Sequence, residues 1–328
     1  YQSSLGLKAD LERCYQQLNT TGQVELFTPG TLDKSGQFLI PQKLYGREVE
    51  VAQLMSAFER VSLGQTEMVL VSGYSGIGKS SLVNEVHKPI VRQRGYFIAG
   101  KFDQFKRNIP YAALIQAFQD LIQQLLTEKA ESLDNWKSKL LTALGENGQI
   151  IIDVIPELER IIGKQPAVSE AGAAEKQNRF NRVFQDLIQV FSQKSHPLVL
   201  FLDDLQWADN TSLKLIQILM TDADSQYFLL IGAYRDNEVD AVHPLTSTVE
   251  KIQEEKGRIN NIVLKQLSLA SVLELIADTL EVENNGKHHQ GISNTRERTQ
   301  PLAELLYNKT QGNPFFLTQL LQTLHSDE

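Results

Sequence analysis

The sequence predicts an α/β fold in which a parallel sheet carries helices on both faces and is followed by a helical C-terminal segment. Three observations lead to this prediction. Short apolar runs alternate with amphipathic helical stretches, a glycine-rich turn joins the first of these runs to a helix, and the pattern beyond residue 267 is helical throughout. The composition agrees, because 41% hydrophobic and 22% charged residues in a chain of 328 are typical of a globular protein.

Each expected element follows from its pattern. Before the sheet, apolar residues at helical spacing predict helices over 5–18 and 49–61. Five short apolar runs predict strands near 68–72, 96–100, 198–202, 227–232 and 262–264. The longer helical patterns lie at 111–126, 133–144, 177–191, 270–280, 301–308 and 313–324. Pro110 suits the first turn of the helix that starts beside it. Because strands alternate with helices, we expect a parallel sheet covered on both faces.

These elements divide the chain into three expected parts. Residues 1–38 read as a helix and a linker, and 39–267 as the sheet domain, with a helical insertion over about 102–195. Residues 268–328 read as a helical lid. The chain begins at Tyr1 rather than Met and stops in a polar stretch, which is typical of a piece of a longer polypeptide.

The glycine-rich turn is a complete phosphate loop, G-x-x-x-x-G-K-[ST], directly after an apolar run. Glycines let its backbone amides converge on phosphates at a helix N-terminus, where the helix dipole also favours negative charge. The lysine supplies a point charge for the β and γ phosphates, the next hydroxyl suits Mg²⁺, and a second serine can add a contact. The residues expected to bind nucleotide are Gly73, Ser75, Gly76, Gly78, Lys79, Ser80 and Ser81.

A second motif offers the metal partner that such a loop needs. The buried run Pro197–Leu202 ends in Asp203 and Asp204, the Walker B arrangement. We expect Asp203 to hold Mg²⁺ together with Ser80. Asp204 could accept a proton from the attacking water or orient it. Both acids could instead cap the turn after the strand. Asp209, further on, reads as the N-cap of a helix.

A third motif is an arginine that follows the fourth apolar run. In the usual phosphate-loop sheet with an inserted strand, that strand lies between the loop strand and the Walker B strand, so its end faces the γ-phosphate. Arg235 is therefore expected to sense this phosphate, since a guanidinium matches two phosphate oxygens. The alternative is an exposed pairing of Arg235 with Asp236 or Glu238.

Charge and composition limit the partners. A formal charge of −8 argues against a nucleic-acid partner or an anionic membrane, because both usually require a basic face. No apolar segment approaches the roughly 18 residues that a membrane span needs. The single cysteine, Cys14, fits a reducing compartment, so we expect a cytoplasmic protein.

Taken in order, these motifs resemble a known family. Leu44–Glu48, the loop at 73–80, Leu198–Asp209, Gly232–Arg235 and Gly312–Phe316 occur in the order found in STAND-type, AAA-like ATPases, the Orc-like AAA ATPase module of signalling proteins. The resemblance covers about residues 38–326 and implies an ASCE-type P-loop NTPase fold.

The resemblance also implies further site residues and cofactors. It implies that Gly46 and Arg47 lie near the adenine and ribose, that Pro314 packs on the adenine from the lid, and that Arg235 is the sensor arginine. For Pro314 the alternative is helix initiation. The implied ligands are ATP or ADP with Mg²⁺.

A finer resemblance concerns the flanks. Ile40–Glu48 and Gly100–Tyr111 look like large bacterial signalling proteins that join a serine/threonine kinase to a histidine kinase, and Tyr1–Leu11 is similar to the last helix of the preceding kinase domain. Neighbouring kinase and sensor domains of the same polypeptide are then the implied partners. Self-association stays open, and kinase activity is implied only for the parent protein.

The leading functional hypothesis is an ATP–Mg²⁺ switch with slow or partner-triggered hydrolysis inside a signalling kinase. Two alternatives remain: an Orc-like DNA-binding ATPase, and a non-catalytic interaction module that keeps ATP as a structural ligand.

Overall fold

The computed structural model describes residues 4–27, 29–30, 40–107, 109–169, 172–284 and 292–326. Part of the expected linker, 31–38, lies outside these ranges. The contacts divide the chain into two compact units, which are described separately below. One unit is Arg47–Lys265, and the other combines Tyr1–Gly46 with Gln266–Glu328.

The larger unit is built on a five-stranded sheet with strand order β2-β3-β4-β1-β5, in which every pair is parallel. The predicted parallel α/β fold is therefore confirmed. Its strands are β1 (Thr66–Ser72), β2 (Tyr96–Lys101), β3 (Leu198–Asp203), β4 (Phe228–Tyr234) and β5 (Ile259–Val263). Strands β1, β3 and β4 are buried along almost their whole length, as expected for a sheet covered on both faces.

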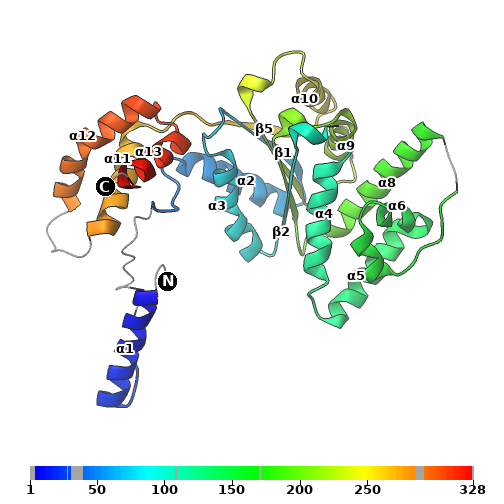
Figure 1. Cartoon of the computed structure of the whole chain (residues 1–328). Coiled ribbons are helices and arrows are strands. Elements are labelled where there is room, and N and C mark those ends of the chain that lie inside the picture. Colours follow the sequence, from blue (N-terminus) through cyan, green and yellow to red (C-terminus); the bar gives the residue numbers. More distant parts are fainter. Residues whose placement is uncertain are drawn as a thin grey trace. The chain divides into compact units, whose positions relative to one another are not determined.

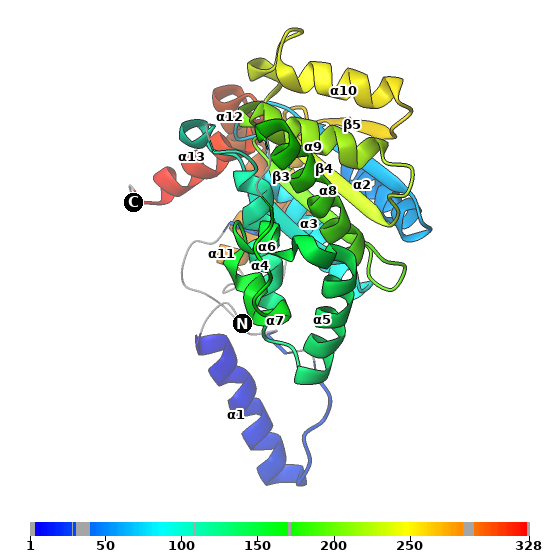
Figure 2. The same cartoon turned by 90° about the vertical axis from the view of Figure 1, so that its right-hand side faces the viewer.

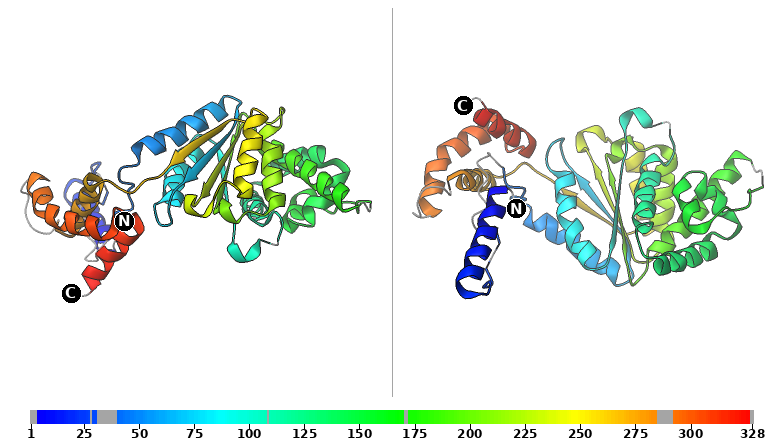
Figure 3. Two further views of the ribbon diagram at one scale, coloured as in Figure 1. Left: turned by 90° about the horizontal axis from the view of Figure 1, so that it is seen from above. Right: turned by 60° about the horizontal axis from the view of Figure 1, so that its bottom comes forward.

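Helices cover both faces of this sheet (Figure 1). On one face lie α2 (Glu48–Ser62) and α3 (Lys79–Arg92), and on the other lie α4 (Ala112–Leu125), α9 (Asn210–Thr221) and α10 (Pro244–Glu254). The view from above in Figure 3 shows the sheet edge-on between these two layers. The side chain of Asp209 accepts hydrogen bonds from the amides of Thr211 and Ser212, so the predicted N-cap of α9 is confirmed.

The insertion between β2 and β3 is helical, as expected, and it packs outside α4 (Figure 2). Its helices are α5 (Ala130–Leu144), α6 (Gly148–Ile152), α7 (Glu159–Ile162) and α8 (Ala173–Phe191). Its apolar side chains, including Phe184 of α8, join one continuous core with the sheet and with Phe118 of α4. The expectation for Pro110 was wrong, because α4 begins only at Ala112, after Tyr111 in a left-handed conformation with φ 62°.

The smaller unit contains α1 (Ser4–Thr21), α11 (Leu269–Asn284), α12 (Ile292–Thr310) and α13 (Pro314–Ser326). Tyr45 packs into its core, against side chains such as Val272 and Leu317. The helical C-terminal region is therefore confirmed, and the segment just before α2 groups with it. Across the described ranges, we find no helix with the length and apolar character that a bilayer crossing requires.

Candidate functional site

The loop between β1 and α3 has a backbone that only glycine adopts easily. Gly73, Gly76 and Gly78 have φ angles of 149°, 76° and 97°. A Cβ on Gly73 would also lie 2.8 Å from the carbonyl oxygen of Leu264. Both conformation and space therefore require glycine at position 73. This backbone leads directly into the first turn of α3, whose free amides can bind an anion.

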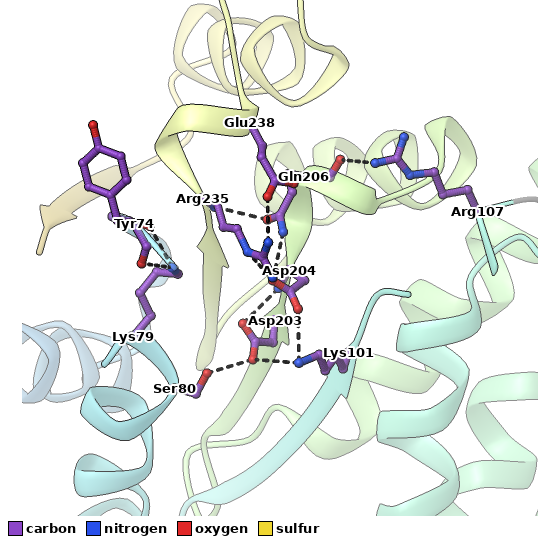
Figure 4. Close-up of polar contacts among 11 residues, drawn as sticks. Tyr74, Lys79, Ser80, Lys101, Arg107, Asp203, Asp204, Gln206, Arg235 and Glu238 are labelled. Carbon is purple, nitrogen blue, oxygen red and sulfur yellow. Dashed lines mark hydrogen bonds and ion pairs between the residues drawn. The ribbon is translucent and has the colours of Figure 1, made fainter. Parts of the chain in front are cut away.

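Lys79 begins α3 and is buried, with only 8% of its surface exposed. Its Nζ donates to the carbonyl oxygens of Gly73, at 2.7 Å, and Tyr74, at 3.0 Å (Figure 4). Burial lowers the pKa of Lys79 from its usual value, and the nearby Asp203 offsets only part of this effect. Among the described residues, no carboxylate lies within ion-pair distance of this ammonium. A buried cation without a counter-ion fits an anionic ligand.

Ser80 and Asp203 meet beside this lysine. The Ser80 hydroxyl donates to Oδ2 of Asp203 at 2.9 Å, and Oδ1 of Asp203 accepts from the backbone amide of Asp204 at 2.9 Å. A hydroxyl next to a carboxylate fits Mg²⁺, which binds oxygen ligands and keeps several of its waters. In the described part of the chain, no cluster of three or more His, Cys, Asp or Glu side chains forms a metal cage. The chain's own residues therefore fit a hydrated Mg²⁺ shared with phosphates.

Asp204 has both carboxylate oxygens engaged. It is buried in a left-handed conformation with φ 56°. Its Oδ1 accepts from Nε2 of Gln206 at 2.8 Å and lies 3.7 Å from Nε of Arg235. Its Oδ2 lies 3.1 Å from Nζ of Lys101, which ends β2 opposite Asp203 in register. Asp204 is thus held among two cations and an amide (Figure 4).

Arg235 follows β4, and β4 lies between β1, which precedes the glycine-rich loop, and β3, which ends in Asp203, as predicted. Its NH1 lies 2.7 Å from Oε1 of Glu238, and its guanidinium carbon lies 4.9 Å from the ring centroid of Trp207. The anticipated pairing with Glu238 is therefore present together with the contact to Asp204. Arg235 therefore contacts two carboxylates at once, through two different nitrogens of its guanidinium.

Sequence reasoning missed two residues of this cluster, Gln206 and Lys101. Gln206 is 2% exposed, and its side chain links Asp204 to the backbone amide of Arg235. The backbone carbonyl oxygen of Gln206 accepts from NH2 of Arg107, at 3.3 Å, and from Nε2 of His243, at 3.2 Å. A lysine at the end of an expected strand was a usable signal for Lys101, whereas nothing in the sequence marks Gln206.

Three further residues of the predicted nucleotide site, Ser75, Ser81 and Arg47, belong to the larger unit. Ser75 and Ser81 lie exposed, one in the loop and one in the first turn of α3. Arg47 is buried, and its NH2 donates to the carbonyl oxygen of Lys265 at 2.6 Å and to that of Ile77 at 3.5 Å. Arg47 therefore ties the phosphate loop to the chain that leaves β5.

Gly46 and Pro314 belong to the smaller unit. Gly46 has φ 61°, and a Cβ there would collide with the side chain of Ser271. Pro314 is the first residue of α13, the position that suits a helix-initiating proline. Their expected contacts with adenine stay a prediction.

Comparison with known proteins gives a family and relatives. A family model described as an AAA ATPase domain matches residues 43–231. A hybrid signal transduction histidine kinase G of Dictyostelium discoideum is 29% identical over 100% of this chain and 11% of its own length. Histidine protein kinase 1 of Candida albicans is 20% identical over 76% of this chain and 12% of its length.

The fold comparison includes a crystal structure of Cdc6p from Pyrobaculum aerophilum. It is 14% identical with a TM-score of 0.44, over 74% of this chain and 51% of that one. The chain spans only about a ninth of the two kinases that it matches. Both kinases come from eukaryotes, so they lend no support to a bacterial setting.

Proposed function

Since this chain belongs to the AAA ATPase domain family, we propose that it binds ATP with Mg²⁺ and hydrolyses it slowly, or only when a partner triggers hydrolysis. The proposal rests chiefly on one observation: a buried lysine without a carboxylate partner among the described residues lies beside a serine–aspartate pair at the end of a phosphate loop. An anionic ligand and a hydrated cation are what this donor set suits.

Each side chain then has a distinct role. Lys79 would neutralise the β and γ phosphates, while Ser80 and Asp203 would hold Mg²⁺, which supplies positive charge to the phosphate oxygens. Asp204 would orient the attacking water, and Arg235 would bind the γ-phosphate.

The surroundings of Asp204 support slow turnover. Its two oxygens are engaged by Gln206 and by Lys101, at 2.8 and 3.1 Å. These partners fix the carboxylate of Asp204, so a water that it orients has to bind beside them. Arg235 is likewise held by Glu238 and by Asp204, and binding a phosphate would weaken these contacts. A partner that rearranges either contact would accelerate hydrolysis.

A regulatory switch is the wider form of this proposal. Nucleotide bound by residues 39–267, with Gly46 and Arg47 near its adenine and ribose, would also contact Pro314, so its state would set the orientation of the lid, 268–328. Neighbouring kinase and sensor domains of a longer cytoplasmic protein would respond to that orientation. The similarity to two histidine kinases supports this setting, as does the STAND-like order of motifs.

Binding is tested by titrating ATP into the nucleotide-free protein with and without Mg²⁺. The Lys79→Ala variant should lose ATP binding, whereas Ser80→Ala and Asp203→Asn should lose mainly the Mg²⁺-dependent part of the affinity. Unchanged ATP affinity in Lys79→Ala would refute the proposal.

Turnover of the full-length protein separates a switch from a structural ligand. If ATP is hydrolysed, Asp204→Asn should lower the rate and leave ATP affinity nearly unchanged. ATP that stays intact over many hours would favour the non-catalytic module. A salt-dependent shift of duplex DNA would instead favour the DNA-binding alternative.

A further inference from the structure

A groove of about 520 Å³ opens beside the Walker B turn. Three segments of the larger unit line it: the end of β2 with the loop that follows, the first turns of α4, and the turn after β3. Its apolar walls come from Phe102, Ile109, Ala112 and Trp207. A groove of this size, partly apolar and partly charged, is typical of a binding site.

Three cations line the groove, Lys101, Lys106 and Arg107, against two carboxylates, Asp103 and Asp209. Both carboxylates accept hydrogen bonds from backbone amides, Asp103 from that of Phe105 and Asp209 from the first amides of α9. Among its cations, Lys101 is paired with Asp204. Arg107 donates only to a neutral carbonyl oxygen among the contacts of the described residues, and Lys106 has no carboxylate within ion-pair distance there.

Apolar side chains project beside these cations. Phe105 is 89% exposed in the short 3-10 helix Gln104–Lys106, and Ile109 is 49% exposed at the groove. Single exposed apolar residues are common, but here two of them flank Lys106 and Arg107. The surface therefore combines apolar contacts with two cations that lack carboxylate partners among the described residues.

The groove is also connected to the candidate catalytic cluster. Arg107 donates to the carbonyl oxygen of Gln206 at 3.3 Å, and the side chain of Gln206 holds Asp204. The ring of Trp207 lines the groove and lies against the guanidinium of Arg235. A ligand that engages Arg107 thus competes with the contact that positions Gln206.

We propose that this groove docks an acidic peptide segment that carries an apolar side chain. Carboxylates of the segment pair with Lys106 and Arg107, and its apolar side chain packs on Ile109 and Trp207. A peptide fits better than a nucleic acid, because the formal charge of −8 repels a polyanion more strongly than it repels a few carboxylates.

The test selects peptides from a phage-displayed library of random dodecamers on the nucleotide-free protein, so that it does not depend on the proposed ATPase activity. Selected sequences should be enriched in Asp and Glu beside aliphatic or aromatic residues. A fluorescently labelled synthetic copy is then titrated with wild type and with the charge-reversed double variant Lys106→Glu/Arg107→Glu. Its Kd should rise about tenfold or more in that variant.

The matched control is Lys137→Glu/Lys194→Glu, which makes the same change in charge at two exposed positions outside the groove. Its Kd should stay within about threefold of wild type, since distant exposed charges are screened. Equal unfolding temperatures would show that both variants are folded. Selection without acidic enrichment, or equal loss in both variants, overturns the proposal. The proposal is also overturned if no peptide binds and a labelled dT12 oligonucleotide binds instead, with an affinity that Lys106→Glu/Arg107→Glu lowers.

Discussion

Replacing Lys79 by methionine should separate nucleotide binding from folding. The change removes a buried ammonium and keeps most of the side chain's volume. The ammonium now donates to the carbonyl oxygens of Gly73 and Tyr74, at 2.7 and 3.0 Å, and burial lowers its pKa. Because a buried charge without a counter-ion is costly, the wild-type loop carries a free-energy cost that an anionic ligand would offset.

The magnitude follows from these contacts. Two hydrogen bonds from a charged donor contribute about 1.5–3 kcal/mol each, so their loss toward phosphate oxygens should weaken ATP binding by roughly 3–6 kcal/mol, or about 10²–10⁴-fold in Kd. In the nucleotide-free protein, losing the two carbonyl contacts is offset by removal of the buried charge, whose desolvation costs several kcal/mol. The free energy of unfolding should therefore change by less than about 2 kcal/mol.

Urea unfolding and calorimetric titration with ATP measure the two effects on the same samples. Lys88→Met is the matched control, since Lys88 is exposed on the same helix, α3. It should leave both quantities nearly unchanged. ATP binding within tenfold of wild type in Lys79→Met, or a loss of more than about 4 kcal/mol of stability, would refute the reasoning.

Three further predictions concern other positions. Burial lowers the pKa of His196 below its usual 6.5, so the folded state binds fewer protons than the unfolded state near that pH. The free energy of unfolding should therefore fall as the pH drops through 6.5. Urea unfolding at a series of pH values should show a weaker fall in His196→Asn. Gly100→Ala would drive a methyl group into the carbonyl oxygen of Ala113 and should cost about 3 kcal/mol or more by chemical unfolding, whereas Gly172→Ala, with open space around it, should cost under about 1 kcal/mol. Glu238→Gln removes the negative charge that pairs with Arg235 and, with Arg235 in its proposed role at the γ-phosphate, should raise single-turnover ATP hydrolysis a few-fold; a lower rate would contradict that role.

The sequence predicted the strands well where they are buried and less well at the edge. The first four apolar runs coincide with β1 to β4 within about two residues, as is usual for element ends. The last strand was expected at 262–264, but β5 spans Ile259–Val263 and includes the exposed Asn260 and Asn261. It pairs only with β1 in this sheet, so it needs no continuous apolar run.

Short helices in the insertion escaped prediction for a related reason. Helices α6 and α7 have only five and four residues. Neither is long enough to display a full amphipathic period. Their apolar side chains, such as Ile151 and Ile161, are buried all the same, because the longer helices around them supply the core.

What the sequence alone determined is the chemistry of the phosphate loop. Its glycines, lysine and serine lie within one run of eight residues, 73–80, and their backbone conformation is local, so this run suffices to predict an anion site between β1 and α3. The pairing of Ser80 with Asp203 was also predictable, because both follow from one rule about the carboxyl ends of parallel strands.

Only the tertiary structure decided what surrounds Asp204. Lys101 reaches it because β2 and β3 are neighbours in register, and Arg235 reaches it because β4 lies beside β3. Gln206 became central only through a turn that buries its amide between these side chains. Such contacts join residues far apart in the chain, and their strength depends on strand order and burial, which no local pattern encodes.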